Sequence, residues 1–501
     1  MAEVASASGE QLESRASRPG ILKLLRLGLS YTPLITRVSL SHSLNLAATS
    51  PYNDVRTAVT VAAIRAFLAP SERSRNITLP QAQRRTIIRV PVRGRVWISR
   101  YTCPVPPEAA SVQACVEKAI ESQAAGHHDT FPVVQMPDVV PVEGEWTGYR
   151  AEAQPSEPLP KVSEEEKYAR MMRGTRSPET TILYFHGGAH AFMDPSTHRT
   201  TVKKLAKITG GRAFSVRYRL APQNVFPSAL VDCFVAYLTL LYPPPGAFHE
   251  PVEAKHLVLA GDSAGGNLAM GLIQLLVDLN RMGEHVMWHG EARPIPVPAA
   301  VAGNSPWLDI THSSLPFYSG DVPEAFDYIG PPSDLGRHGY KPCETWPSSP
   351  PRKYVYATDD MLMHPYVTST MRRDWTGFPP VYLCIGWERL AYENKFLAQK
   401  LWRDGVVVVL DEFEAMPHCF ALVVTKLAES RRCLNAWAGF IRQAAEGETL
   451  TSRATTIQAR TVKETPLDFG DLCDVSDEVV RQRVVDTIEK TRAWNPFASR
   501  L

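Results

Sequence analysis

The segment that decides the fold is HLVLAGDSAGGNLAM, residues 256–270. Its first residues are apolar enough for a buried strand, and residues 267–279 continue with helical spacing. Between strand and helix stands Ser263, with Gly261 two residues before it and Gly265 two residues after it. A sharp strand-to-helix turn needs glycine at both places, because neighbouring backbone comes too close for side chains. The segment predicts an exposed nucleophilic serine; the alternative is a glycine-rich turn whose serine only caps the helix.

A second glycine-rich turn lies upstream. The predicted strand 181–185 ends in His186-Gly187-Gly188-Ala189-His190. Glycines directly after a strand let backbone N–H groups point into a cavity, so N–H groups of this turn, together with that of Ala264, are predicted to hold the negative oxygen of a tetrahedral intermediate. Without a ligand, the same residues would form an ordinary tight turn. For the two histidines of this turn we expect a structural hydrogen-bonding role rather than the role of a base.

Short apolar runs alternate with helical stretches through this part of the chain. The predicted strands are 181–185, 213–218, 256–260, 299–303, 381–385 and 406–410, and the predicted helices lie near 195–208, 226–241, 265–282, 391–404 and 420–442. Apolar strands that alternate with helices predict an α/β fold, with a mostly parallel central sheet covered by helices on both faces.

A nucleophilic serine needs a base within reach and an acid that orients the base. His418 suits the role of base, because it follows the predicted strand 406–410 and precedes a helix. Three other histidines, at 312, 338 and 364, lie in a proline-rich interval and are weaker candidates. The alternative for His418 is a histidine in an ordinary loop.

The acid is expected after the predicted strand 381–385. Glu388 comes first there and is the preferred candidate. Glu393 lies five residues further on, inside a predicted helix, where a solvated surface glutamate is the usual finding.

The remaining regions are predicted to surround this catalytic core. We expect N-terminal cap helices and a strand in 1–104, a connection rich in proline and charge in 105–177, the catalytic domain in 178–445 with an inserted lid at 305–378, and a linker with a C-terminal helix in 446–501. The lid is rich in aromatic residues, namely Trp307, Phe317, Tyr318, Phe326, Tyr328 and Trp346. They suggest a fairly apolar substrate, unless they simply pack the cap.

Composition narrows the classes of function. The 54 basic and 52 acidic residues of this 501-residue chain nearly cancel, which argues against a nucleic-acid-binding protein. Eight cysteines without a CxxC pair, and a start without a basic and apolar leader, predict a reducing cytoplasmic location. The longest apolar runs are too short to cross a bilayer. Residues 21–27 form a basic amphipathic segment; packing on its own domain is favoured over peripheral membrane contact.

Taken together, the motifs resemble the hormone-sensitive-lipase-like branch of the α/β hydrolases, which includes bacterial esterases and arylacetamide deacetylase relatives. The resemblance rests on His186-Gly187-Gly188, on the elbow Gly261-Asp262-Ser263-Ala264-Gly265-Gly266 and on the segment 218–222, and it covers roughly 178–445. The sequences of residues 305–309 and 416–420 look closest to those of fungal members. Two positions depart from the pattern: Ala189 replaces a third glycine, and Tyr392 replaces an acidic residue.

The resemblance implies a serine carboxylesterase with a triad of Ser263, Glu388 and His418. Gly188, Ala189 and Ala264 would supply the oxyanion donors, and the N-terminal region would fold over the site. The expected substrate is a small or medium, fairly apolar acyl ester, in natural-product metabolism or detoxification, with no metal or cofactor. Lactone, acyl-transfer or lyase chemistry at the same site is an alternative. A non-catalytic receptor is a weaker one, since receptors related to this family have lost the histidine that stands here at 418.

Overall fold

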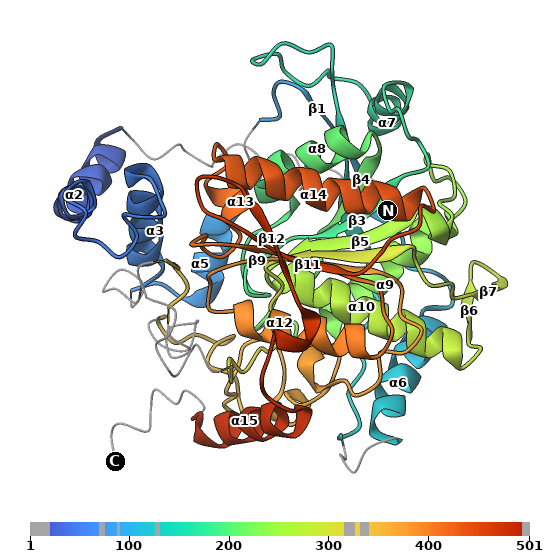
Figure 1. The fold of residues 1–501 in the computed structure, drawn as a ribbon. Coiled ribbons are helices and arrows are strands. Elements are labelled where there is room, and N and C mark those ends of the chain that lie inside the picture. Colours follow the sequence, from blue (N-terminus) through green and yellow to red (C-terminus); the bar gives the residue numbers. More distant parts are fainter. Residues whose placement is uncertain are drawn as a thin grey trace.

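The computed structural model describes residues 21–69, 76–87, 91–125, 131–314, 326–330 and 340–492; for 21–30 and 124–125 it describes the helical backbone alone. Within this part of the chain a ten-stranded sheet has the order β1-β2-β4-β3-β5-β8-β9-β10-β11-β12 (Figure 1). The strands are β1 Val96–Cys103, β2 Val142–Tyr149, β3 Thr181–Phe185, β4 Arg212–Val216, β5 Leu257–Asp262, β8 Ala300–Asn304, β9 Val381–Gly386, β10 Val408–Phe413, β11 Arg453–Ile457 and β12 Glu464–Leu467. A separate small hairpin consists of β6 His285–Trp288 and β7 Glu291–Pro294.

The middle of the sheet is parallel. Strands β4, β3, β5, β8, β9, β10 and β11 run in one direction, whereas β1, β2 and β12 add antiparallel edges. In the pairing of β3 with β5, Phe185 lies opposite Gly261, so the loop after β3 and the turn after β5 leave the same edge of the sheet. The prediction of a mostly parallel α/β sheet is confirmed.

Helices cover both faces of the sheet. The α-helices of the described ranges are α2 Ile21–Ser43, α3 Val55–Leu68, α5 Leu79–Thr86, α6 Ala109–Ala125, α7 Glu164–Arg173, α8 Pro195–Thr209, α9 Ser228–Leu241, α10 Ala264–Arg281, α12 Ala391–Arg403, α13 Phe420–Val423, α14 Ala428–Ala445 and α15 Asp477–Lys490. In Figure 1, α8 and α14 lie on one face, and α9, α10 and α12 lie on the other. Alternate side chains of β3 belong to two hydrophobic cores, one on each face of the sheet. Ile182 belongs to the core that includes Trp437 of α14, and Leu183 belongs to the core that includes Leu272 of α10.

The region 105–177 is more than a connection, which corrects the expectation from its composition. Strand β2 lies within it and pairs with both β1 and β4, and its Trp146 is fully buried. The sequence of β2, VEGEWTGY, alternates glycine and charge with few aliphatic residues, so its hydrophobic pattern is weak. Buried Glu145 is paired with Arg199 of α8, which offsets the cost of burying its charge.

The polar linker expected after residue 445 is also part of the sheet. Strand β11 pairs in parallel with β10, and β12 closes the edge against β11. Their sequences, RATTI and ETPL, are short and polar, as is common at sheet edges. The C-terminal helix α15 follows as expected.

The described part of the interval 305–378 is irregular, with 3-10 turns at Asp359–Met361 and Ser369–Met371. Trp307, Phe326, Tyr328 and Trp346 are buried there, so these aromatic side chains pack the cap, whereas Phe317 and Tyr318 lie outside the described residues.

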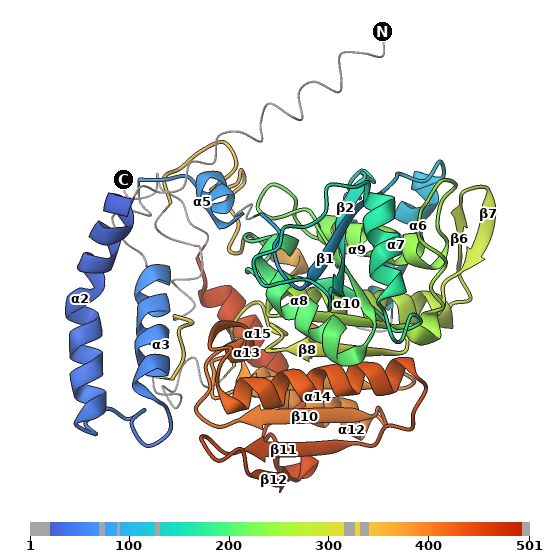
Figure 2. The same cartoon turned by 90° about the horizontal axis from the view of Figure 1, so that it is seen from above.

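Two N-terminal helices form an antiparallel hairpin beside the main body, with α3 between α2 and the rest of the molecule (Figure 2). None of the helices in the described ranges is both long enough and apolar enough to cross a membrane.

Candidate active site

Ser263 occupies the turn between β5 and α10. Its φ of +52° lies in the left-handed region, which a non-glycine residue adopts only at a cost. The turn is tight: a side chain on Gly265 would place its Cβ 2.1 Å from the carbonyl oxygen of Phe185. Two backbone bonds hold the serine from both sides, from its N–H to Asn304 O and from Trp307 N–H to its carbonyl, each 3.0 Å. The sequence prediction of a strained elbow agrees with this geometry.

The loop after β3 lies directly against the elbow. A Cβ built on Gly187 would be 3.1 Å from Ser263 Cβ. Gly188 has a φ of +116° and Ala189 a φ of +52°, which turn the backbone of this loop. Among the described residues, the N–H groups of Gly188, Ala189 and Ala264 donate to no protein acceptor. Three such donors beside the serine suit an oxyanion.

Asp262 ties that loop to the elbow. Its Oδ1 accepts hydrogen bonds from Tyr184 OH at 2.6 Å and from Gly187 N–H at 3.2 Å. Its Oδ2 contacts His198 Nε2 at 3.2 Å. Burial alone would raise the pKa of Asp262, but the charge and hydrogen bond of His198 outweigh burial and lower it. The charged Asp262 side chain therefore holds the loop after β3 against the turn that carries Ser263.

The candidate base and acid are in contact. Nδ1 of His418 is hydrogen-bonded to Oε2 of Glu388, and the two residues are 5% and 0% exposed. They follow the adjacent parallel strands β10 and β9, so both loops leave the same edge of the sheet. Burial alone would lower the pKa of His418, but the neighbouring Cys419 sulfur and the Glu388 carboxylate outweigh it and raise the pKa.

Ser305 links Glu388 to the loop that carries His418, and no sequence motif marks this residue. Its hydroxyl donates to Glu388 Oε1 at 2.6 Å and accepts the N–H of Cys419 at 3.0 Å. Glu388 Oε1 also accepts the Gly386 N–H at 3.0 Å, which leaves Oε2 for His418. Only its position could have indicated this role, because Ser305 is a polar residue directly after β8.

The cap holds the base loop as well. Asp327 Oδ1 accepts the N–H of His418 at 3.1 Å, and Tyr328 OH donates to the His418 carbonyl at 2.6 Å. Burial, followed by the charge of Glu388, raises the pKa of Asp327. Nothing in the local sequence distinguishes these two residues.

Ser263 and the loop that carries His418 meet at one carbonyl. Asn304 O accepts the Ser263 N–H at 3.0 Å and lies 3.8 Å from Cys419 Sγ. Cys419 Sγ is in turn 3.4 Å from His418 Nε2. Within the described part of the chain, no hydrogen bond joins the Ser263 hydroxyl to that nitrogen. The site therefore brings together the elbow and the base–acid pair, with a thiol beside the ring nitrogen that faces away from Glu388.

The other histidines are held in structural positions. Burial lowers the pKa of His186 to about 4 and that of His190 to about 3, so both are neutral at physiological pH. His186 stacks on Tyr218, and His190 stacks on Tyr356. Buried His364 contacts the carbonyl of Ile120. His312 stacks on Trp307, and His338 lies outside the described residues.

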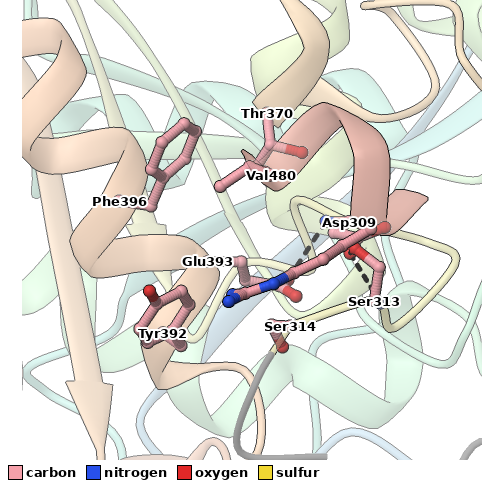
Figure 3. Close-up of a pocket in the computed structure, with 9 residues that line it drawn as sticks. Asp309, Ser313, Ser314, Thr370, Tyr392, Glu393, Phe396 and Val480 are labelled. Carbon is pink, nitrogen blue, oxygen red and sulfur yellow. Dashed lines mark hydrogen bonds between the residues drawn. The ribbon is translucent and has the colours of Figure 1, made fainter. Parts of the chain in front are cut away.

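Glu393, the second candidate acid, is buried rather than solvated. Its Oε1 accepts the N–H groups of Leu308 and Asp309 at 2.7 and 3.2 Å, and burial raises its pKa well above the ordinary range. It lines a small cavity between α12 and α15, where Figure 3 shows it beside Asp309 and Ser313. Neither Ser263 nor His418 lines that cavity, so it is separate from the candidate site.

Comparisons with known proteins identify the fold and the family. A family described as alpha/beta hydrolase fold matches residues 182–326. An acetyl-hydrolase of Streptomyces hygroscopicus is 30% identical over 279 residues, which span 55% of this chain and 80% of the relative. The carboxylesterase/phospholipase LipF of Mycobacterium tuberculosis is 26% identical over 58% of this chain and 70% of its own. The esterase LipU of the same organism is 28% identical over 54% of this chain and 79% of its own.

Among solved structures, an esterase from the bacterial hormone-sensitive lipase family aligns with 68% of this chain and 99% of its own, at 21% identity and a TM-score of 0.43. The three sequence relatives are bacterial, so the expected closeness to fungal members is not confirmed. The family match includes Ser263 and the loop after β3, but ends before Glu388 and His418.

Proposed function

The chain belongs to the hormone-sensitive-lipase-like family of α/β hydrolases, and on this premise we propose that it is a serine carboxylesterase with a triad of Ser263, His418 and Glu388. The observation that carries the proposal is the buried hydrogen bond between His418 Nδ1 and Glu388 Oε2, on neighbouring loops at the edge that presents the elbow. An imidazole oriented in this way keeps Nε2 for the proton of a nucleophile.

In the first step His418 Nε2 takes the hydroxyl proton of Ser263 as its oxygen attacks the ester carbonyl. The tetrahedral intermediate then expels the alcohol, which receives the proton from His418. Water, deprotonated by the same nitrogen, attacks the acyl-enzyme and releases the acid. Glu388 holds the imidazole through Nδ1 and stabilises the imidazolium.

The oxyanion of both intermediates would bind to the N–H groups of Gly188, Ala189 and Ala264. Ala264 opens α10, so the partial positive charge of that helix N-terminus adds to its donor. Each well-placed donor of this kind contributes about 3 kcal/mol to the transition state. The hydrogen bond from Gly187 N–H to Asp262 supports this role, because it fixes the donor loop relative to the serine.

A small or medium acyl group is the substrate class that we propose. The relative named acetyl-hydrolase supports a short acyl chain. A place in natural-product metabolism or detoxification is proposed from the family resemblance alone.

The test uses the purified full chain and p-nitrophenyl esters with acyl chains of graded length. We expect turnover with the shorter esters, labelling by a fluorophosphonate, and loss of both in Ser263→Ala, with kcat lower by at least about 10⁴-fold. Full turnover by the Ser263→Ala protein would reject the proposal. Product analysis with an added alcohol acceptor distinguishes hydrolysis from acyl transfer.

A further inference from the structure

Exposed apolar side chains concentrate on the N-terminal hairpin, which we define as α2, the loop 44–54 and α3. Of the twelve large apolar side chains found exposed among the described residues, six lie between residues 35 and 68. They are Ile35 (39% exposed), Leu40 (58%), Leu44 (66%), Leu46 (75%), Phe67 (70%) and Leu68 (54%). Leu40, Leu44 and Leu46 lie at the loop end of the hairpin, and such a group of exposed apolar side chains marks an interaction surface, whereas single ones are ordinary.

The charge of the chain is unevenly distributed toward the same region. Residues 21–68, which form the hairpin, contain five lysines and arginines but only one carboxylate, Asp54, whereas the rest of the chain has 49 basic and 51 acidic residues. Asp54 is itself the N-cap of α3 and accepts the N–H of Thr57 at 2.7 Å. Arg37 and Arg56 are exposed on the two helices. The hairpin is therefore both apolar and cationic.

We propose that this hairpin binds an anionic lipid surface, with its apolar side chains inserted among the acyl chains and its arginines beside the headgroups. Peripheral segments bind bilayers in this way, through burial of apolar side chains plus attraction to acidic lipids. A second copy of the chain fits less well, because a symmetric contact would bring two cationic hairpins together. A nucleic-acid backbone would leave Leu44 and Leu46 in water.

The hairpin also contacts the loops of the candidate active site. The ring of Tyr52 lies 5.4 Å from that of Trp387, the residue before Glu388. Asn53 Nδ2 donates to the carbonyl of Ala415, in the loop that carries His418, at 3.2 Å. A bilayer under the hairpin would therefore lie close to the loops that carry base and acid, where apolar esters dissolved in the membrane are concentrated. This last step rests on the proposed function; lipid binding itself does not.

The experiment is vesicle flotation of the full chain. Vesicles of phosphatidylcholine alone are compared with vesicles containing 30% phosphatidylglycerol, at low and at high salt. We expect flotation with the anionic vesicles, and at least tenfold less with neutral vesicles or at high salt. Leu44→Ser/Leu46→Ser and Arg37→Glu/Arg56→Glu should each reduce flotation at least tenfold, with unchanged thermal midpoint and unchanged turnover of a soluble ester.

Matched controls come from elsewhere on the molecule. Met287→Ser removes a side chain that is 40% exposed on the β6–β7 hairpin, at the opposite side in Figures 1 and 2. Lys161→Glu/Lys426→Glu reverses two exposed charges outside the cationic region. Both controls should float as the unmodified chain does.

Absence of flotation, equal flotation with neutral vesicles, or an equal loss in the controls would overturn the proposal. So would a dimer in solution that the hairpin variants dissociate, because a second copy would then cover this surface. Lipid binding by an inactive Ser263→Ala protein would keep the inference separate from the proposed esterase activity.

Discussion

The hydroxyl of Ser305 shows how single atoms arrange the candidate site. It donates to one oxygen of Glu388 and accepts the backbone N–H that follows His418. Because a hydroxyl has one proton, this arrangement fixes its direction and leaves the other Glu388 oxygen to the imidazole. With the proposed triad, Ser305 is therefore a positioning residue that links Glu388 to the loop of His418.

The two buried glutamates should behave differently when their charge is removed. Glu388→Gln loses the anion that stabilises the imidazolium, so we expect kcat to fall by roughly 10³- to 10⁴-fold. Burial raises the pKa of Glu393 and so favours its neutral form, and an amide can still accept the N–H groups of Leu308 and Asp309. Glu393→Gln should therefore keep kcat within about threefold. Steady-state kinetics with a p-nitrophenyl ester measures both; the opposite ranking would move the acid role to Glu393.

The raised pKa of His418 predicts the acid limb of the pH profile. Activity needs the neutral imidazole, so kcat/KM should fall as pH drops through a pKa above the ordinary value of about 6.5. In Glu388→Gln the limb should move to lower pH, because the carboxylate that favours the charged ring is gone. His186 and His190, with pKa values of about 4 and about 3, cannot produce a limb near neutrality. A limb unchanged by Glu388→Gln would show that another group controls it.

Sequence order predicted the main residues of the site but not their supports. Ser263, Glu388 and His418 each follow a strongly apolar strand, so periodicity and order along the chain locate them. Asp327 and Tyr328 hold the base loop from an irregular cap segment. No periodic pattern reports such contacts, since they depend on how the cap folds back.

Among the elements, hydrophobic patterning worked for the interior strands and failed at the edges. Strand β3, TILYF, is buried on both faces and is apolar throughout. Strands β2 and β11 lie toward the ends of the sheet, where polar side chains find partners such as Arg199 and water. Their sequences therefore resemble those of loops, and only pairing partners far along the chain identify them as strands.

The turn between β11 and β12 anchors the N-terminal hairpin through Arg460. Its guanidinium donates to the carbonyls of Ser50 at 2.8 Å, Tyr52 at 3.2 Å and Asn53 at 2.7 Å. Arg460→Ala leaves these carbonyls without a charged donor, so we expect cleavage in the loop 44–54 by a dilute protease to become at least fivefold faster.

Arg431→Ala is the matched control for that experiment. Arg431 also donates to one backbone carbonyl, that of Lys426, but within its own helical region. Its removal should leave the cleavage rate in 44–54 unchanged. Equal rates in the Arg460→Ala and unmodified proteins would mean that the contacts of Asn53 and Tyr52 with the base and acid loops hold the hairpin without it.

For the whole molecule, buried histidines predict how stability depends on pH. Burial lowers the pKa to about 3 at His190 and to about 4 at His186, His249 and His364. In the unfolded chain these groups titrate near pH 6.5, so the unfolded state binds protons that the folded state does not, and stability falls as pH drops from about 6.5 toward 4. His198 and His418 have raised pKa values and act oppositely, with stability present below pH 6.5 and lost as pH rises through the folded pKa.

Each of the four histidines with a lowered pKa is therefore expected to destabilise the fold as pH drops from 7.5 to 5, whereas His198 and His418 act in the opposite direction. One histidine with a folded pKa of about 4 contributes at most about 2 kcal/mol to this loss of stability at pH 5. His364 is the one to remove, because it contacts the Ile120 carbonyl and accepts the Tyr366 N–H far from the candidate triad. In His364→Gln the urea midpoint, followed by tryptophan fluorescence, should fall less between pH 7.5 and pH 5 than in the unmodified chain. An identical pH dependence of the midpoint in the variant and the unmodified chain would contradict the assignment of His364 as a neutral core residue.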